Sequence, residues 1–203
     1  MEIQIKKQMD SREENKEMEA VKRTSGLVHI YCGNGKGKTT ASVGAAVRAA
    51  GNGKTVLIKR FLKNDHSGEV EALKQIPGIT VLPCTRQFGF SWKMKQEEKE
   101  EAKQYYGKEL EKAWKMALET DENGTPAFDL LVMDEAIGAC RQGFICEERL
   151  LELLRTRPAS LEVILTGRGP SEALLNAADY VTEMALRRHP YERGIGAREG
   201  IEY

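Results

Sequence analysis

A glycine- and lysine-rich loop is the part of this chain whose residues point most directly to chemistry. Residues 33–40 read GNGKGKTT and follow an apolar, β-branched run over residues 27–32. This order predicts a strand, a tight turn and a helix that begins at Lys38. The backbone N–H groups of such a turn and the positive end of the helix dipole bind phosphate. Lys38 would bring a charge to the phosphates, and the Thr39 hydroxyl would bind Mg²⁺.

The loop departs from the usual P-loop pattern at its first glycine. Cys32 occupies that position, and the glycines alternate instead at Gly33, Gly35 and Gly37. We therefore expect the loop to hold a polyphosphate in a different register from an ordinary ATPase.

An acidic pair follows a second apolar strand. Residues 130–133 are apolar at every position, as in a central parallel strand, and Asp134 and Glu135 come directly after them. A carboxylate there lies opposite a phosphate loop, where Mg²⁺ needs an oxygen ligand. The two motifs together predict a nucleotide site, whereas a Gly-Lys-Thr match alone would be weak.

Two further segments could contribute to this site. Residues 166–170, TGRGP, follow another predicted strand, and their glycines would let the backbone approach a ligand. Arg168 would then contact phosphate or ribose, although a surface charge is the alternative. Residues 88–92, FGFSW, form an aromatic cluster that either anchors the core or makes an apolar wall over a large flat ligand.

The composition excludes several classes of protein. The 203 residues carry a formal net charge of zero, which does not favour nucleic acid binding. No apolar run is long enough to cross a membrane, and no signal peptide is evident. The four cysteines lack paired spacing, so we expect neither a zinc site nor disulfides but small buried side chains in a cytoplasmic protein.

The charge pattern divides the chain into two parts. Residues 1–24 are highly charged without a continuous apolar stripe, and they form either a mobile tail or a helix that docks on a partner. Residues 25–203 form one domain. Strands are predicted at 27–32, 55–58, 79–82, 130–133, 161–165 and 180–184, and helices at 38–50, 69–75, 95–119, 147–154 and 171–177. This alternation predicts a single-domain α/β fold of the P-loop NTPase (RecA-like) type, with a mainly parallel sheet between helices on both faces.

Taken together, these residues resemble a known family. From about Gly26 to Tyr203 the chain is similar to the P-loop ATP:corrinoid adenosyltransferases, which act on cob(I)yrinic acid a,c-diamide and cob(I)alamin. The resemblance is carried by the loop, Arg48, FLK at 61–63, GFSW at 89–92, the acidic pair, TGRG at 166–169 and the tail at 194–203.

The resemblance implies transfer of the 5′-deoxyadenosyl group of ATP to the cobalt of a reduced corrinoid, with triphosphate released, in adenosylcobalamin biosynthesis or salvage. It implies Mg²⁺ or Mn²⁺ as cofactor, a homodimer in which residues 1–24 cover the partner's site, and a flavoprotein as possible reductant. No general base is required, because cob(I) is itself the nucleophile.

The resemblance also implies residue roles. Catalysis would depend on Lys38, Phe90 and Trp92, the two aromatic residues lining the lower face of the corrinoid and displacing its axial ligand. Thr39 and Glu135 would bind the metal directly. Asp134 would lie in the second coordination shell or would hold a metal-bound water. His189 would contact the corrinoid, although Arg188–His189 and Ala197–Arg198 differ from the usual tail. ATP would be bound by Gly33, Asn34, Gly35, Lys36, Gly37, Lys38, Thr39, Thr40, Arg48 and Arg168, with Asn34 and Arg48 near ribose or adenine.

Two other functions remain open on the residues alone. A P-loop ATPase or kinase would use the same loop, with Glu135 polarising water or a hydroxyl, and would release ADP. A nucleotide-regulated binding module would grip its partner with the aromatic loop and would not turn over.

Overall fold

The structure is a computed structural model that describes residues 25–65, 67–89 and 91–202. Expectations about residues 1–24 and Phe90 therefore lie outside the described residues. Within the described part, six strands form one sheet in the order β3-β2-β4-β5-β1-β6, and every neighbouring pair is parallel. The strands are β1 (Val28–Cys32), β2 (Val56–Arg60), β3 (Ile79–Val81), β4 (Leu130–Asp134), β5 (Glu162–Thr166) and β6 (Tyr180–Glu183).

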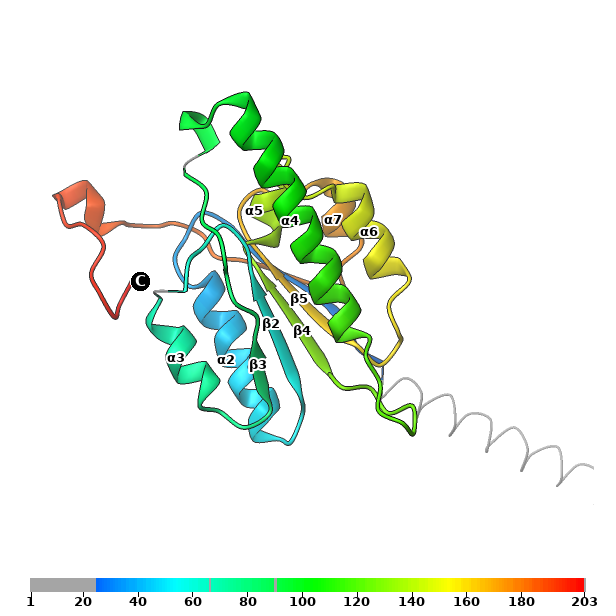
Figure 1. The fold of residues 1–203 in the computed structure, drawn as a ribbon. Coiled ribbons are helices and arrows are strands. Elements are labelled where there is room, and N and C mark those ends of the chain that lie inside the picture. The colour runs from blue at the N-terminus through cyan, green and yellow to red at the C-terminus, as the bar shows by residue number, and fades with distance from the viewer. Residues whose placement is uncertain (1–24, 66, 90, 203) are drawn as a thin grey trace, which may run out of the picture.

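Helices cover both faces of this sheet, as Figure 1 shows. One face carries α2 (Lys38–Gly51) and α3 (Gly68–Lys74), and the other carries α4 (Gln96–Ala117), α5 (Ala136–Arg141), α6 (Glu147–Arg155) and α7 (Glu172–Asn176). Two short 3₁₀ helices complete the described elements: η1 (Ser91–Lys93) lies between β3 and α4, and η2 (Pro190–Arg193) follows β6. The predicted α/β fold with a parallel sheet is confirmed, while α5 was not predicted.

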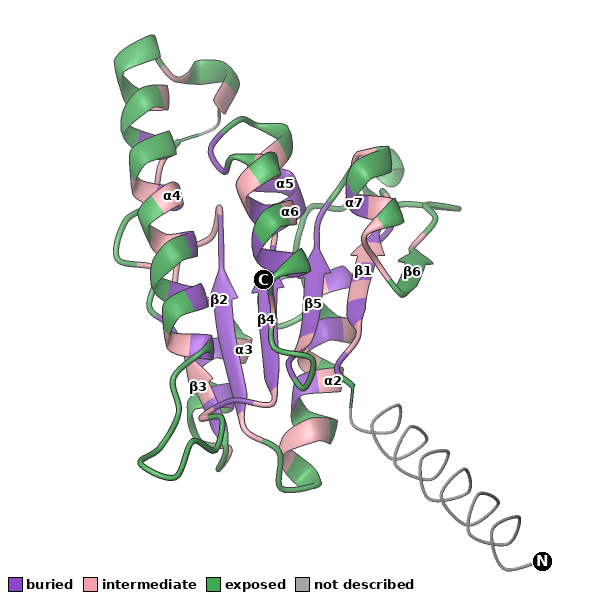
Figure 2. Ribbon diagram, turned by 90° about the vertical axis from the view of Figure 1, so that its right-hand side faces the viewer, coloured by how far each residue is buried: buried purple, intermediate pink, exposed green. Residues whose placement is uncertain are grey.

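The core has two layers because the central strands β2, β4 and β5 are buried on both sides, whereas β6 at the edge is exposed (Figure 2). Along β4, Leu131 and Met133 pack into the cluster under α4–α7, while Leu130 and Val132 pack into the cluster under α2 and α3. All five β4 residues are buried, which confirms the prediction of a central parallel strand.

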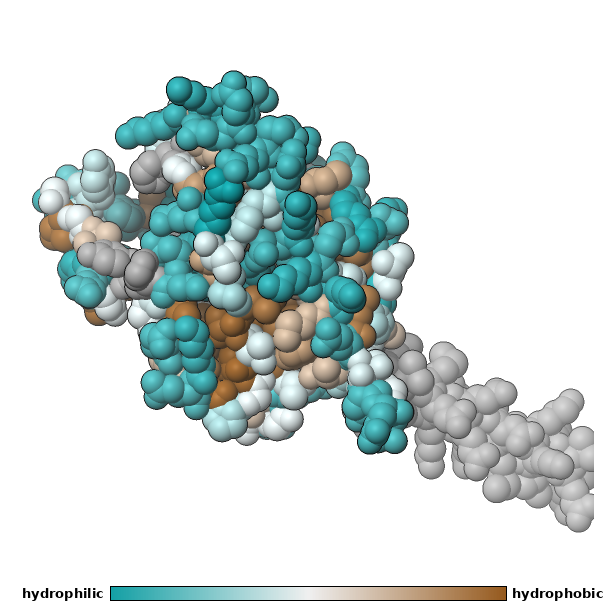
Figure 3. Space-filling view, viewed as in Figure 1, coloured by the Kyte–Doolittle hydropathy of each residue, from teal (hydrophilic) through white to brown (hydrophobic). Residues whose placement is uncertain are grey.

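The longest helix, α4, is partly exposed, as its charge pattern predicted. A stripe of apolar residues at helical spacing is buried against the sheet, including Tyr106, Leu110 and Trp114. Figure 3 shows the hydrophilic outer surface over this helix, with hydrophobic colour gathered below it near β2 and β3. Across the described ranges, no helix combines the length and apolarity that a membrane crossing needs.

The strand order places three loops next to one another. Strand β5 lies between β1 and β4, so the segment after Thr166 is flanked by the glycine-rich loop after β1 and by the acidic pair after β4. All of these strands are parallel, and their carboxyl ends therefore meet at one edge of the sheet, where open α/β proteins bind ligands.

Candidate active site

The alternating glycines of residues 33–40 are explained by the segment that follows β6. The amide of Gly35 donates a hydrogen bond to the Met184 carbonyl at 2.7 Å. A Cβ at Gly33 or Gly35 would come within 2.5 or 2.6 Å of that same oxygen. Gly33 also has a φ of 97°, and Gly37, directly before α2, a φ of 114°, both in the left-handed region that glycine tolerates. The loop is therefore built against the strand-end backbone rather than around the usual first glycine.

Lys38 points back across this loop. Its ammonium donates to the Gly35 carbonyl at 2.8 Å, and only 7% of the residue is exposed. Burial, followed by the nearby positive charge of Arg168, lowers the pKa of Lys38. A desolvated cation beside the loop attracts a phosphate more strongly than one in water.

A buried polar cluster forms around Asp134 at the end of β4. Its Oδ1 accepts hydrogen bonds from Thr166 at 2.5 Å and from Thr39 at 3.0 Å. Its Oδ2 accepts from the Lys63 ammonium at 2.5 Å, and that ammonium also donates to Thr39 Oγ1 at 2.8 Å. The cluster thus joins the ends of β2, β4 and β5 to the first turn of α2.

Glu135 lies beside this cluster in a different role. Its backbone has a φ of 59°, and its N–H donates to Thr166 Oγ1 at 2.9 Å. Its carboxylate turns toward Gly138 of α5, where a Cβ would meet Oε2 at 2.8 Å. Burial, followed by the charge of Asp134, raises the pKa of Glu135. Among the described residues, Asp134 is thus the carboxylate that contacts Thr39. The expectation that Thr39 and Glu135 hold the metal, with Asp134 in the second coordination shell or on a water, stays a prediction.

The donor set around Asp134 fits Mg²⁺. Magnesium prefers oxygen ligands and is usually bound by one or two carboxylates together with substrate phosphates, not by an all-protein cage. The hydroxyl of Thr39 and the carboxylate of Asp134 supply such oxygens. Thr39 Oγ1 lies 3.0 Å from Asp134 Oδ1 and 3.3 Å from Asp134 Oδ2. Across the described ranges, this site included, no group of three or more His, Cys, Asp or Glu side chains could hold a metal by itself.

Arg168 follows β5 at the same edge of the sheet. The preceding Gly167 has a φ of 146°, and a Cβ there would meet the Gly138 nitrogen at 2.6 Å, so the backbone packs directly on α5. Arg168 is exposed and is the second residue after β5, the strand between β1 and β4. The structure therefore places this predicted residue at the same edge of the sheet as the glycine-rich loop.

The other predicted site residues lie either beside the glycine-rich loop or farther from Lys38. Arg48 is in the last turn of α2, about 15 Å along the helix axis from Lys38. Lys36 forms an ion pair with Glu202 at 3.7 Å, so the C-terminal tail passes close to the loop. The exposed residues Asn34 and Thr40 lie near the two ends of the loop. His189 accepts the Tyr191 amide at 3.1 Å at the start of η2.

The aromatic side chains at positions 88 and 92 differ in burial. Phe88 packs on Tyr105 and Tyr106 with ring centroids 5.5 and 5.6 Å apart, so it anchors the core. Trp92, in η1, is 74% exposed, and Phe90 lies outside the described residues. A hollow of about 210 Å³ adjoins the segment and is lined by Arg86, Gln87, Phe88, Gly89, Lys93, Met94, Glu98 and Glu101.

Two residues of the polar cluster had no assigned role from sequence. Lys63 lies just after β2 and Thr166 is the last residue of β5, positions from which a parallel sheet directs side chains to its ligand edge. Both stood in segments that carry the family resemblance. Their contacts with Asp134 depend on strand order, which local pattern does not reveal.

The chain is similar to known proteins over most of its length. Residues 24–203 match the family described as ATP:corrinoid adenosyltransferase BtuR/CobO/CobP. A corrinoid adenosyltransferase of Pseudomonas aeruginosa is 34% identical over 179 residues, covering 88% of this chain and 84% of the relative. The corrinoid adenosyltransferase CobA of Salmonella typhimurium is 30% identical over 182 residues, covering 88% and 86%. One from Sinorhizobium is 32% identical over 182 residues, covering 88% and 80%. Because the family model matches residues 24–203 and these relatives cover most of the chain, the chain belongs to the ATP:corrinoid adenosyltransferase family.

Proposed function

We propose that this protein transfers the 5′-deoxyadenosyl group of ATP to the cobalt of a reduced corrinoid and releases triphosphate. The observation that carries the proposal is the junction of Lys38, Thr39 and Asp134 at one edge of the sheet, in a chain of this family. In this proposal the three residues form the phosphate-binding site, and membership of the family indicates that the acceptor is a corrinoid.

The reaction needs a leaving group rather than a base. The electron pair of cob(I) attacks C5′ of the ribose, the C5′–O bond breaks, and its electrons remain on the triphosphate. The loop amides, Lys38 and Arg168 would stabilise the charge that develops there. Thr39 and Asp134 would hold Mg²⁺, which neutralises phosphate charge when bound.

The odd loop sequence suits this chemistry. A kinase presents the γ-phosphorus to its acceptor, whereas this reaction must present C5′. A loop packed on Met184, with Cys32 at the usual first glycine, would shift or reverse the polyphosphate and so bring the ribose outward. A nucleotide-bound structure with conventional phosphate placement would contradict this part of the proposal.

The corrinoid would lie on the side of the aromatic segment. The exposed ring of Trp92, with Phe90, would cover its lower face and displace the axial ligand, which makes cobalt easier to reduce. His189, in the tail that passes the loop, would contact its periphery. We further propose a cytoplasmic homodimer in which residues 1–24 cover the partner's site, with a flavoprotein as reductant.

The decisive experiment mixes the purified protein with MgATP and chemically reduced cob(I)alamin without oxygen. We expect the spectrum of adenosylcobalamin to develop with an equal amount of triphosphate. Trp92→Ala should greatly slow this reaction and leave ATP affinity unchanged, whereas Lys38→Met should weaken ATP binding. ADP and phosphate with an unchanged corrinoid would instead identify an ATPase or kinase.

A further inference from the structure

The Lys63 ammonium occupies the position where the metal of the proposed reaction would bind. It lies 2.8 Å from Thr39 Oγ1 and 2.5 Å from Asp134 Oδ2, the two side chains with the oxygens that Mg²⁺ would need. Two ligands at right angles on Mg²⁺, with bonds of about 2.1 Å, lie about 3.0 Å apart. Thr39 Oγ1 lies 3.0 and 3.3 Å from the two Asp134 oxygens, so the pair already has that spacing.

An ammonium and Mg²⁺ cannot share these oxygens. The ion requires close, nearly octahedral contacts, and two cations so near each other would repel strongly in a buried site. Asp134 is 1% exposed, which leaves little water to screen that repulsion. Lys63 must therefore leave before the metal binds.

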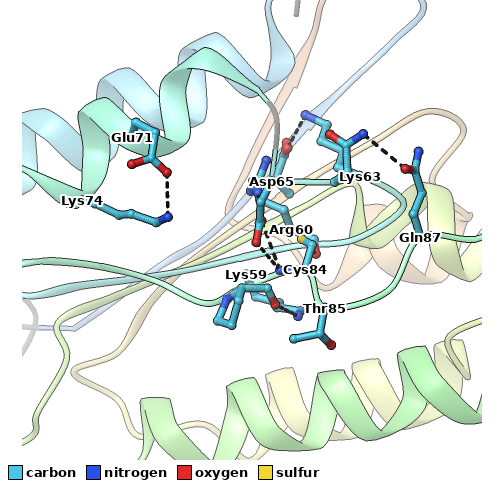
Figure 4. A network of polar contacts seen from close by, with 12 residues as sticks. Lys59, Arg60, Lys63, Asp65, Glu71, Lys74, Cys84, Thr85 and Gln87 are labelled. Atoms are coloured by element: carbon cyan, nitrogen blue, oxygen red, sulfur yellow. Dashed lines mark hydrogen bonds and ion pairs between the residues drawn. The ribbon is translucent and has the colours of Figure 1, made fainter.

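The backbone on both sides of Lys63 is held by hydrogen bonds and an ion pair to neighbouring segments. The Phe61 amide before it donates to the Asp134 carbonyl at 2.8 Å, and Leu62 has a φ of 56°. After it, Asp65 forms an ion pair with Arg60 and accepts the Cys84 amide (Figure 4). The lysine side chain itself is 25% exposed on a flexible stem, so it can leave by rotation without a change in the loop.

From these contacts we propose that Lys63 competes with the divalent metal for Thr39 and Asp134 and is displaced when the metal–nucleotide complex binds. This proposal rests on the proposed function for its metal and nucleotide. The lysine neutralises Asp134 until the metal arrives, and after displacement its charge is available to the phosphates. Metal binding then becomes coupled to nucleotide binding, because the phosphate ligands of the complex make displacement more favourable than the metal alone does, and the metal alone displaces the lysine only at high concentration.

The test measures Mn²⁺ affinity by electron paramagnetic resonance in the absence of nucleotide and corrinoid. Lys63→Met should bind Mn²⁺ about tenfold or more tightly than the parent protein, because the buried carboxylate has lost its partner. Lys63→Arg keeps the charge and should bind like the parent. Lys54→Met is the matched control, since Lys54 pairs with Asp129 at the opposite end of β2. Equal affinities for Lys63→Met and Lys54→Met would overturn the proposal.

A second measurement needs no variant. Acetylation of the unaltered protein, followed by mass spectrometry, should show Lys63 reacting several-fold faster at saturating Mn²⁺, while Lys54 is unchanged. An unchanged Lys63 rate would overturn displacement. Neither measurement uses a corrinoid, so either can fail while adenosyl transfer succeeds, and either can succeed in a protein that does not transfer.

Discussion

Thr166 holds the two acidic residues in their separate roles. Its hydroxyl, fully buried, donates to Asp134 Oδ1 at 2.5 Å and accepts the Glu135 amide at 2.9 Å. Thr166→Val keeps the shape but leaves a buried amide and a carboxylate oxygen each short of a partner. We expect a loss of about 1–3 kcal/mol in the free energy of unfolding, measured in urea. Thr166→Ser retains the hydroxyl and should lose much less stability than Thr166→Val. Equal losses in the two variants would mean that packing, rather than the hydroxyl, is responsible.

The cysteines differ in exposure, which the sequence did not indicate. Cys32 is buried as expected, but that expectation is wrong for Cys146, which is exposed with its thiol 3.2 Å from Glu148. Burial raises the pKa of the Cys140 thiol to about 12 and also raises the pKa of Cys84. In native buffer, a thiol reagent followed by absorbance should therefore show one fast phase from Cys146. That phase should vanish in Cys146→Ser, and its persistence would assign it to another cysteine.

Between elements, the close approach of the β5 loop to α5 is made by glycine. A Cβ at Gly167 would meet the Gly138 nitrogen at 2.6 Å and Ile137 Cβ at 2.8 Å, at a φ of 146°. Gly167→Ala should destabilise the fold by about 1–3 kcal/mol and reduce activity, because Thr166 and Arg168 would shift. Gly44→Ala, in mid-α2 with open space around it, should stabilise by about 0.4–1 kcal/mol. Urea unfolding of the two variants gives opposite signs if backbone approach decides the outcome.

The elements were largely predictable, whereas their contacts were not. The six strands and the larger helices follow apolar runs and glycine stops that can be read along the chain. The helix α5 was missed because its six residues, AIGACR, are too short and too apolar to show a helical period. The Lys63–Thr39–Asp134 contact was equally hidden, since it joins three elements whose neighbours are set by strand order. Motifs thus located the edge of the sheet, but not the hydrogen bond from Thr39 to Asp134.

For the molecule as a whole, the start of β1 is fastened to the sheet by Glu162. Its carboxylate accepts the Leu27 amide at 2.8 Å and lies 2.5 Å from His29 Nε2, and the ring of Tyr180 packs against His29 at 4.7 Å. The histidine is therefore hydrogen-bonded at the edge of the core. Because β1 lies between β5 and β6 and leads into the phosphate loop, this anchor supports the site from the far end of the strand.

Because Glu162 carries a charge in this anchor, the free energy of unfolding should fall as the pH becomes acidic. Burial opposes ionisation of Glu162, but the bonds from His29 and Leu27 outweigh it and lower the pKa of that carboxyl. A carboxyl whose pKa is lower in the folded than in the unfolded chain stabilises the fold above the unfolded value of about 4.3, and this contribution is lost as pH falls through the folded value. Glu162→Gln should therefore be less stable than the parent at pH 7, and the gap should narrow below about pH 4. Urea unfolding of both proteins from pH 7 to pH 3 measures this, and a gap independent of pH would mean that geometry, rather than charge, holds β1.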